Sequence, residues 1–449
     1  MIGRVLAAVR QAPDAPRIED PERVDALYGT YRNHVLYGSL VAYALFYFCR
    51  KNLSIAKPLL HEDLGYTNTQ LGELDSWLYI TYGVFKFLSG LVADRASPRV
   101  FLVGGLVASA LVNLAFGFSA SLGSASAVLP VLVSLWAVNG VVQSTGAPAS
   151  AKLIAVWFSV SERGTKTGIR NISHQGGGGL VLIVAGVFAS YWGWQGAMMG
   201  PAVIALVGAI LVARFIHDRP ESAGLPPIEE HRQDRQGNED EDRDVSSGRL
   251  ILERVLLNPR VWLVALASAC TYVARYGALD WSAKYLKEER GLDIGDAAVR
   301  TSLLELVGIP GALLCGWISD KLGARRAPVV MVSLLLLALC TWSLYSVPDD
   351  QPWMITALLG LMGFFTYGPQ MLLAGVAPVD MSSKRVAAAA VGFTGLMSYA
   401  GATAQSRISG WLVDDYGWAR AIDFWAAAAL TGAVLCIPMW AMAPRTGTK

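Results

Sequence analysis

Residues 42–52 read AYALFYFCRKN, and residues 269–281 read ACTYVARYGALDW. Each stretch places one arginine, Arg50 or Arg275, inside a long apolar region. An arginine near the middle of a bilayer costs about 3 to 15 kcal/mol, so it is retained mainly where an anion compensates its charge. The two arginines are 225 residues apart, and similar offsets recur elsewhere in the chain. This pattern predicts two related halves that each present one arginine to a shared anion site.

The composition indicates a membrane protein built of α-helices. Hydrophobic residues form 53% of the 449 residues and charged residues 16%, whereas a soluble domain carries about 25% charged residues. A helix needs about 20 apolar residues to cross the hydrocarbon core. We therefore expect an all-α protein that resides in a lipid bilayer and has no nucleic-acid partner. Twelve spans are expected, near residues 34–58, 73–93, 99–120, 128–157, 164–190, 194–216, 259–287, 297–319, 327–346, 352–376, 384–413 and 420–442.

Lysine and arginine gather in alternate loops, which predicts the orientation of the chain. The loops after the third, fifth and ninth spans (SASLGSAS, SYWGWQG and PDDQP) carry neither residue, and the loop after the seventh span carries charges of both signs. Because the first thirty or so residues are polar, we expect no cleaved signal peptide. We expect an integral protein of a bacterial cytoplasmic (inner) membrane with both termini in the cytoplasm. The basic residues behind this expectation are Arg95, Arg99, Arg163, Lys166, Lys321, Arg325, Arg326, Lys384 and Arg385.

A polar segment divides the chain, and motifs repeat on its two sides. GLVADR begins at Gly90 and GWISDK at Gly316, while YWGW ends at Trp194 and DYGW at Trp418. Two parallel six-helix repeats with a site between them are the plan of the major facilitator fold. The expected parts are a cytoplasmic segment 1–33, a six-helix half 34–216, a partly disordered cytoplasmic linker 217–258, a second six-helix half 259–442 and a cytoplasmic tail 443–449.

The repeated loops each contain an aspartate beside a basic residue, Asp94 in the first half and Asp320 in the second. These loops resemble the loop motif of the major facilitator superfamily, where such charges can tie neighbouring helices together. The resemblance implies that Asp94 and Asp320 take part in gating, because these contacts break when the halves rock. The alternative is a solvated turn that follows the positive-inside rule.

Several further stretches resemble the organophosphate:phosphate antiporter family of this superfamily, over nearly the whole chain. This family includes glycerol-3-phosphate and hexose-phosphate transporters and a related sugar-phosphate sensor. The stretches include YALFYFCRKN at 43–52, SERG at 161–164, HQGGGG at 174–179, RYGALDW at 275–281 and YGPQML at 367–372. The resemblance implies the major facilitator fold with twelve membrane helices.

In this family the arginines that match Arg50 and Arg275 bind phosphate, and a histidine that matches His174 approaches it. The chemistry agrees, since a guanidinium offers a planar fork of donors that fits two phosphate oxygens. The alternatives are that the arginines pair with Asp280 or Glu305 for packing alone, or that His174 is a hydrogen-bonded core residue. The resemblance also implies a pocket lined by Tyr43, Tyr47, Tyr82, Lys86, Asn171, Tyr276, Tyr367, Tyr399 and Arg407, and a coupling or gating role for Asp280 and Glu305.

Three residues depart from the family pattern. Ala147 stands where the glycerol-3-phosphate transporters have a tryptophan, which leaves more room beside Arg50. Arg407 lies within the eleventh span without a nearby acidic residue, and Arg170 replaces an aromatic residue in the fifth span. Extra cations favour a substrate with a second anionic group, although Arg170 could also extend to the cytoplasmic surface.

These features together predict a monomeric secondary transporter without cofactor or metal, and not an enzyme, because His174 has no nucleophile at a recognisable spacing. We expect exchange of an organophosphate for inorganic phosphate by alternating access. Glucose 6-phosphate, glycerol 3-phosphate and phosphoglycerate remain open as substrates. Two alternatives also remain open: a membrane sensor of external sugar phosphate that uses the same site, and proton-coupled uptake in which Asp280 or Glu305 titrates.

Overall fold

The computed structural model describes residues 11–93, 96–232, 247–323, 325–348, 351–382 and 386–440. These ranges form helices and contain no β-strand. The first half consists of α2 (Pro21–Phe48), α3 (Leu53–Leu64), α4 (Asn68–Ala93), α5 (Pro98–Phe118), α6 (Ala125–Gln143), α7 (Gly146–Trp157) and α8 (Val160–Phe215). The second half consists of α11 (Pro259–Glu288), α12 (Ile294–Leu306), α13 (Gly308–Lys321), α14 (Arg326–Ser343), α15 (Pro352–Met371), α16 (Ala377–Met381), α17 (Ala387–Tyr416), α18 (Trp418–Leu435) and α19 (Ile437–Trp440).

Short helices complete the structure between these elements. Two of them, α9 (Ile228–Arg232) and α10 (Ser247–Ile251), belong to the linker region. The 3-10 and π segments are η1 (Ser119–Leu122), η2 (Pro220–Ala223), η3 (Leu252–Leu256), η4 (Leu344–Ser346) and η5 (Leu372–Val376).

The described residues of each predicted span fall within one helix or a consecutive pair of helices and the turn between them. The predicted fifth and sixth spans share α8, which changes direction where Gly193 adopts φ 61°, a conformation open to glycine. Eight helical segments in the described ranges are long and apolar enough to cross a membrane, and the segment 161–215 contains two spans. The helices α2, α4 and α17 fall short of this limit of apolarity and charge.

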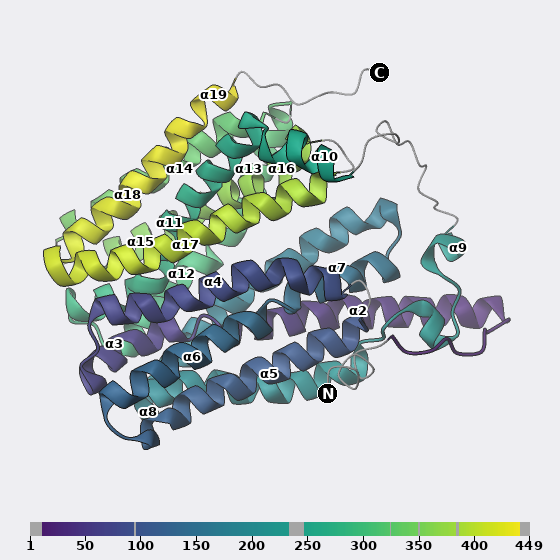
Figure 1. The fold of residues 1–449 in the computed structure, drawn as a ribbon, viewed down its shortest axis with the longest axis horizontal. Helices are drawn as coiled ribbons and strands as arrows, with labels where there is room; N and C mark the ends of the chain where they lie inside the picture. Colours follow the sequence, from purple (N-terminus) through teal and green to yellow (C-terminus); the bar gives the residue numbers. More distant parts are fainter. Residues whose placement is uncertain are drawn as a thin grey trace.

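The two halves lie side by side and meet closely at one end (Figure 1). The chain turns there at Gly65, Gly291 and Gly417, all with positive φ, and we call this the turn end. Contacts between the halves join α4 to α17 and α8 to α12. Toward the opposite end, which carries α9 and α10 and is called the linker end, the helices of the two halves diverge in Figure 1.

Glycines allow the closest approach between α4 and α17. A Cβ on Gly72 would lie 2.1 Å from the Ser406 carbonyl oxygen, and one on Gly410 would lie 2.2 Å from the Asn68 carbonyl oxygen. Neither glycine can accept a side chain while the halves keep this contact, so these positions fix how tightly the turn end closes.

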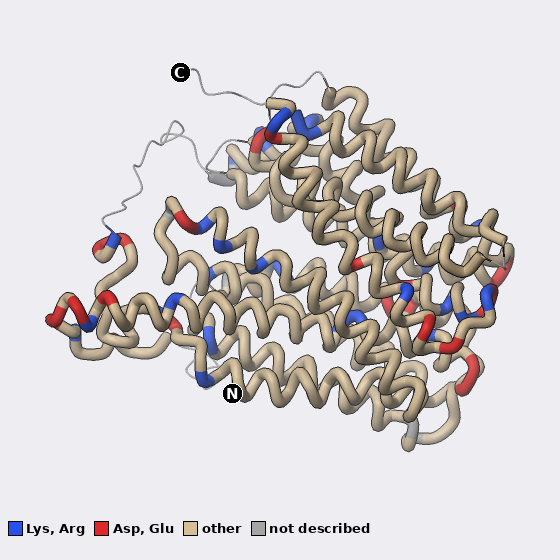
Figure 2. Tube along the Cα trace, turned by 180° about the vertical axis from the view of Figure 1, so that it is seen from behind, with Lys and Arg blue, Asp and Glu red and all other residues tan. Residues whose placement is uncertain are grey.

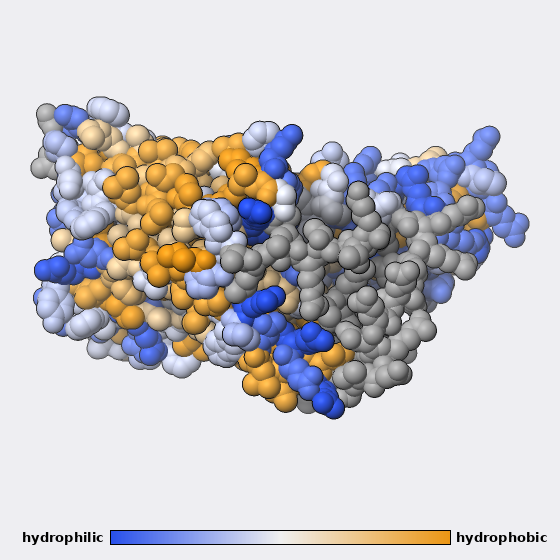
Figure 3. Space-filling view, turned by 90° about the horizontal axis from the view of Figure 1, so that it is seen from above, coloured by the Kyte–Doolittle hydropathy of each residue, from blue (hydrophilic) through white to orange (hydrophobic). Residues whose placement is uncertain are grey.

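The surface agrees with an integral membrane protein. Most charged residues lie toward the two ends of the helices (Figure 2). The face seen in Figure 3 is hydrophobic over a broad region and hydrophilic toward its two ends. Large apolar side chains are well exposed within the predicted spans, for example Leu111, Leu313 and Leu339. Such a surface is stable where lipid replaces water.

The described part of the linker packs against the amino-terminal segment. The Ala15 amide donates to the Glu221 carbonyl at 3.0 Å, and the Ile18 amide donates to the Gly224 carbonyl at 2.9 Å. The Tyr28 hydroxyl donates to the Pro226 carbonyl. Residues 220–232 of the predicted linker are therefore ordered against the first half.

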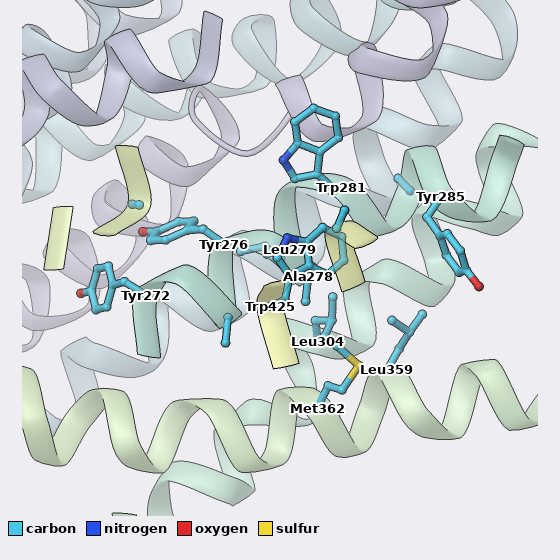
Figure 4. Close-up of a cluster of buried hydrophobic side chains, with 14 of the residues drawn as sticks. Tyr272, Tyr276, Ala278, Leu279, Trp281, Tyr285, Leu304, Leu359, Met362 and Trp425 are labelled. Carbon is cyan, nitrogen blue, oxygen red and sulfur yellow. The ribbon is translucent and has the colours of Figure 1, made fainter. Parts of the chain in front are cut away.

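The second half is centred on α11, which is buried along most of its length. Figure 4 shows Tyr272 and Tyr276 projecting away from Leu304 and Met362, which pack on another side of α11. One side of α11 thus packs in the core of the second half. Tyr272 and Tyr276, on the other side, lie in the contact region between the halves.

Candidate anion-binding site

The first predicted span is interrupted at residues 49–52, between α2 and α3. Such a break leaves carbonyl groups without helical donors. The Cys49 carbonyl accepts hydrogen bonds from Asn113 Nδ2 at 3.0 Å and Asn139 Nδ2 at 2.7 Å. Gln143 Nε2 donates to the Phe46 carbonyl at 2.8 Å. Three buried amides of α5 and α6 therefore stabilise the break, which holds Arg50.

Arg50 is surrounded by aromatic rings instead of carboxylates. Its Cζ lies 4.0 Å from the ring centre of Tyr82 and 5.3 Å from that of Tyr47. Only 6% of the residue is exposed, and its Nε has no hydrogen-bond partner among the described residues. A buried guanidinium with an unused donor is suited to receive an anion.

Arg275 occupies a more polar environment on α11. Its Nη2 donates to the Tyr367 hydroxyl at 2.9 Å, and its Nη1 donates to the Tyr276 hydroxyl at 3.3 Å. Glu305 Oε1 lies 3.4 Å from Nη2, and both side chains are almost fully buried. The second oxygen of Glu305 has no hydrogen-bond partner in the described structure, so the carboxylate contacts Arg275 through one oxygen only.

His174 connects the surroundings of the two arginines. Its ring centre lies 5.9 Å from that of Tyr47 on α2 and 6.0 Å from that of Tyr367 on α15. Tyr47 is a neighbour of Arg50, and Tyr367 binds Arg275. The structure thus brings the three predicted phosphate ligands together from both halves of the chain.

The predicted pocket tyrosines form one aromatic cluster around these ligands. The ring centres of Tyr82 and Tyr399 are 4.8 Å apart, which joins α4 of the first half to α17 of the second. Two further tyrosines that the sequence analysis did not single out, Tyr79 and Tyr272, complete the cluster. The predicted members are Tyr43, Tyr47, Tyr82, Tyr276, Tyr367 and Tyr399.

The glycine run after His174 packs against both halves. A Cβ on Gly177 would lie 2.6 Å from the Ala44 carbonyl oxygen, and one on Gly178 would lie 2.9 Å from Glu305 Cδ. The absence of side chains at these positions therefore lets α8 approach α2 on one side and the carboxylate partner of Arg275 on the other.

Lys51 points toward the turn end, where it forms an ion pair between the halves. Its Nζ lies 2.7 Å from Asp280 Oδ1, and the two side chains are 1% and 2% exposed. The Tyr79 hydroxyl donates to the other oxygen of Asp280 and accepts a hydrogen bond from Lys51 Nζ at 3.2 Å. Asp280, predicted for coupling or gating, is thus fully engaged in a contact that holds the turn end closed.

A second buried lysine extends this contact. Lys57 on α3 pairs with Asp75 on α4, and its Nζ donates to the Asp280 carbonyl at 3.1 Å. Its ammonium group also lies 4.3 Å from the ring centre of Trp281. Lys57 therefore binds the same turn of α11 as Lys51 does.

Nearer the surface, the carboxylate of Asp414 at the end of α17 binds the first turn of α4. The amides of Asn68 and Thr69 donate to its carboxylate at 3.0 and 2.7 Å, and both side chains donate as well. Burial alone would raise the pKa of Asp414, which lies beyond the predicted span, but these donors lower it below its ordinary value. A carboxylate at a helix amino terminus is also favoured by the helix dipole.

Two predicted pocket residues, Lys86 and Asn171, lie around the linker-end side of the cluster. Lys86 is exposed, and its Nζ lies 5.7 Å from the ring centre of Tyr399. Asn171 is exposed and accepts a hydrogen bond from Arg170 Nη2 at 2.7 Å. Lys86 therefore adjoins the aromatic cluster directly, whereas Asn171 is connected to it through Arg170.

The structure places Arg407 outside the cluster, contrary to its predicted position in the pocket. Its side chain is exposed, its Nε donates to Ser76 Oγ at 3.1 Å, and it follows Tyr399 by two helical turns, about 12 Å. Asp320 lies at the linker end, where it pairs with Arg326 at 2.6 Å, and Asp94 lies outside the described residues.

Several residues of this region were missed by the sequence analysis. Lys57 and Asp75 lie 18 positions apart on consecutive helices, and the buried amides Asn113, Asn139 and Gln143 belong to two apolar spans. Polar residues inside apolar spans were the available signal, because such residues usually have a polar partner. The described residues contain no group of three or more His, Cys, Asp or Glu placed to hold a metal ion.

The chain resembles known transporters over most of its length. Residues 39–406 match the Major Facilitator Superfamily. A "Probable hexose phosphate transport protein" of Chlamydia trachomatis is 37% identical, with 94% of each chain covered. A "Membrane sensor protein UhpC" of Salmonella typhimurium is also 37% identical, with 98% and 99% covered. A "Glycerol-3-phosphate transporter" of Bacillus subtilis is 36% identical, with 92% and 93% covered.

A solved structure supports the fold independently. It is a bacterial homologue of the human lysosomal transporter Spinster, which is 16% identical and superimposes with a TM-score of 0.72 over 92% of this chain and 97% of that one. The architecture is therefore the twelve-helix fold of a transporter family, whose members are not enzymes.

Proposed function

The chain belongs to the Major Facilitator Superfamily and, within it, to the organophosphate:phosphate antiporter family, and from that premise we propose that it exchanges an organophosphate for inorganic phosphate. The observation that carries the proposal is the pair Arg50 and Arg275, which come from different halves and are linked by Tyr47, His174 and Tyr367. Two guanidiniums can neutralise a dianion and bind its oxygens in pairs.

The charges also supply a reason for exchange. In any occluded state without an anion, two buried cations face each other in a region that contains little water, at an expense of several kcal/mol. A bound phosphate bridges both halves and removes that barrier. An empty carrier should therefore stall, and each inward passage of organophosphate should require an outward passage of phosphate.

The ion pairs at the turn end provide the gate. With both termini on the cytoplasmic side, as the loop charges predict, the turn end faces outward and is closed in this structure. Opening it must separate Lys51 from Asp280. The contact between Arg275 and Glu305 is long, at 3.4 Å. A bound anion that draws Arg275 away from Glu305 would weaken the hold on α11 and so favour opening.

A sensor of external organophosphate is the second candidate. It is supported by the 37% identity to a protein named a membrane sensor, which extends over nearly the full length of both chains. A sensor would bind organophosphate at the same arginines without exchanging it at a useful rate, so a transport measurement separates the two functions.

The decisive experiment uses the purified full chain in phosphate-loaded proteoliposomes with labelled phosphate or glucose 6-phosphate outside. We expect uptake from loaded vesicles and almost none into phosphate-free vesicles, even with an imposed proton gradient. Arg50→Lys and Arg275→Lys should abolish uptake while the protein stays folded, since lysine keeps the charge and loses the planar fork. Uptake into empty vesicles that follows the proton gradient would establish proton coupling instead. Binding without uptake would establish a sensor.

A further inference from the structure

We propose that Arg170, together with Lys86, forms a second anion subsite one helical turn from the phosphate site toward the linker end. The substrate would then be an organophosphate with a second anionic group, such as a carboxylate or another phosphate. This inference rests on the proposed function, because it names the substrate class of the same site.

The position of Arg170 follows from the register of α8. Arg170, His174 and Gly178 are spaced four residues apart, so they share one face of the helix. His174 contacts the tyrosines of the phosphate site, and Gly178 packs against Glu305. Arg170 is therefore the next residue of an inward-facing stripe, about 6 Å from His174 along the helix axis.

The contacts of Arg170 confirm that it faces inward. Its Cζ lies 5.3 Å from the ring centre of Tyr43, and Tyr43 lies 5.8 Å from Tyr47, a neighbour of Arg50. A side chain that extended to the cytoplasmic surface would leave these rings. Nε and Nη1 of Arg170 are buried without hydrogen-bond partners in the described ranges, so the guanidinium has donors available for a ligand.

Lys86 occupies the corresponding place on α4. It follows Tyr82 by four residues, and Tyr82 lies against Arg50. Its ammonium group stands beside Tyr399, and no acidic residue pairs with it among the described residues. Two helices of the first half thus each add one uncompensated cation, one turn from the phosphate ligands in the same direction.

A neutral sugar ring would leave both cations unpaired. A second anionic group would pair with them through charge-assisted hydrogen bonds, which are stronger than bonds to neutral hydroxyls. Arg407 does not bind this second anionic group, because its side chain lies near Ser76 on the turn-end side of the cluster. The cation that binds the second anionic group of the substrate is therefore Arg170 rather than Arg407.

The test compares 3-phosphoglycerate with glycerol 3-phosphate as external substrates for phosphate-loaded proteoliposomes of the full chain. The wild type should bind 3-phosphoglycerate more tightly. Arg170→Gln should raise the half-saturating concentration of 3-phosphoglycerate about tenfold more than that of glycerol 3-phosphate, as expected for one lost charge-assisted hydrogen bond. Arg170→Lys should restore part of the preference, and Lys86→Gln should lower it.

Lys166→Gln is the matched control, because Lys166 lies one turn further toward the linker end, over the Phe158 ring at 5.6 Å. It should leave the preference unchanged. Equal losses for glycerol 3-phosphate and 3-phosphoglycerate in Arg170→Gln, or no wild-type preference between them, would overturn the subsite while phosphate exchange still supports the proposed function. An absence of phosphate-for-phosphate exchange in the wild type would reject the proposed function itself.

Discussion

Replacing Asp280 by asparagine should open the turn end of the protein. Asp280 accepts the Lys51 ion pair at 2.7 Å and the Tyr79 hydroxyl, and it holds α11 against the first half. Asparagine has nearly the same shape and keeps an oxygen acceptor, but it leaves the buried ammonium group of Lys51 without an opposite charge. The change therefore acts on the closed state and spares the surrounding packing.

The magnitude follows from the burial of the pair. Both side chains are at most 2% exposed, and removing one partner of a buried ion pair costs about 3 to 5 kcal/mol. A remaining hydrogen bond to the asparagine oxygen returns about 1 kcal/mol. The closed state should thus lose about 2 to 4 kcal/mol relative to the open state, which changes their ratio by about 30- to 1,000-fold.

The assay is a distance measurement between the halves at the turn end. Spin labels at Asp63→Cys and Asp415→Cys occupy exposed positions in the last turns of α3 and α17. Cys270, a cysteine that is only partly buried, is replaced by serine to prevent background labelling. Pulsed electron paramagnetic resonance should show a longer distance population in Asp280→Asn than in the parent chain.

Lys287→Gln is the matched control for this measurement. Lys287 pairs across the same interface with Glu62 at 2.5 Å, but the Glu62 side chain is 46% exposed. Exposed pairs contribute about 0 to 1 kcal/mol, so this variant should shift the populations less than about fivefold. A distance distribution in Asp280→Asn that matched the parent or the Lys287→Gln control would refute the reasoning.

Three further predictions concern the helix contacts and the turn end. Gly178→Ala should slow phosphate exchange in proteoliposomes, because the new Cβ would crowd the buried carboxylate of Glu305. Gly176→Ala, with open space around its Cβ, should retain the rate. Equal rates in the two variants would contradict this prediction. Asn139→Leu should lower the free energy of unfolding by about 1 to 3 kcal/mol, because the Cys49 carbonyl loses a buried donor, and should weaken the thermal stabilisation that phosphate provides; unchanged stabilisation would limit Asn139 to packing. Because its pKa is lowered, Asp414 should stabilise the closed turn end at pH values above the ordinary pKa of aspartate and lose that contribution as the pH falls through its lowered pKa. The spin-label distance would report this loss. Asp414→Asn should be open already at neutral pH, and a closed Asp414→Asn variant would count against this role.

The sequence alone determined the membrane class and the helical fold class, and it singled out the candidate ligands, because these depend on local or periodic properties. Each span is a continuous apolar stretch, so hydropathy locates it wherever the neighbours lie. Arg50, His174 and Arg275 are unusual within apolar helices, and their chemistry restricts what they can bind. The resemblance to a family then supplied the tyrosines that the structure gathers around them.

Only the tertiary structure decided which side of each helix faces the interior and which charges meet. The sequence placed Arg407 in the pocket and left Arg170 outside it, yet packing turns Arg407 toward Ser76 and Arg170 toward Tyr43. The partners Lys51 and Asp280 are 229 residues apart, and no local pattern relates residues on separate halves. A buried ion pair and a helix break are stabilised by neighbours in space, so their existence depends on how the halves pack.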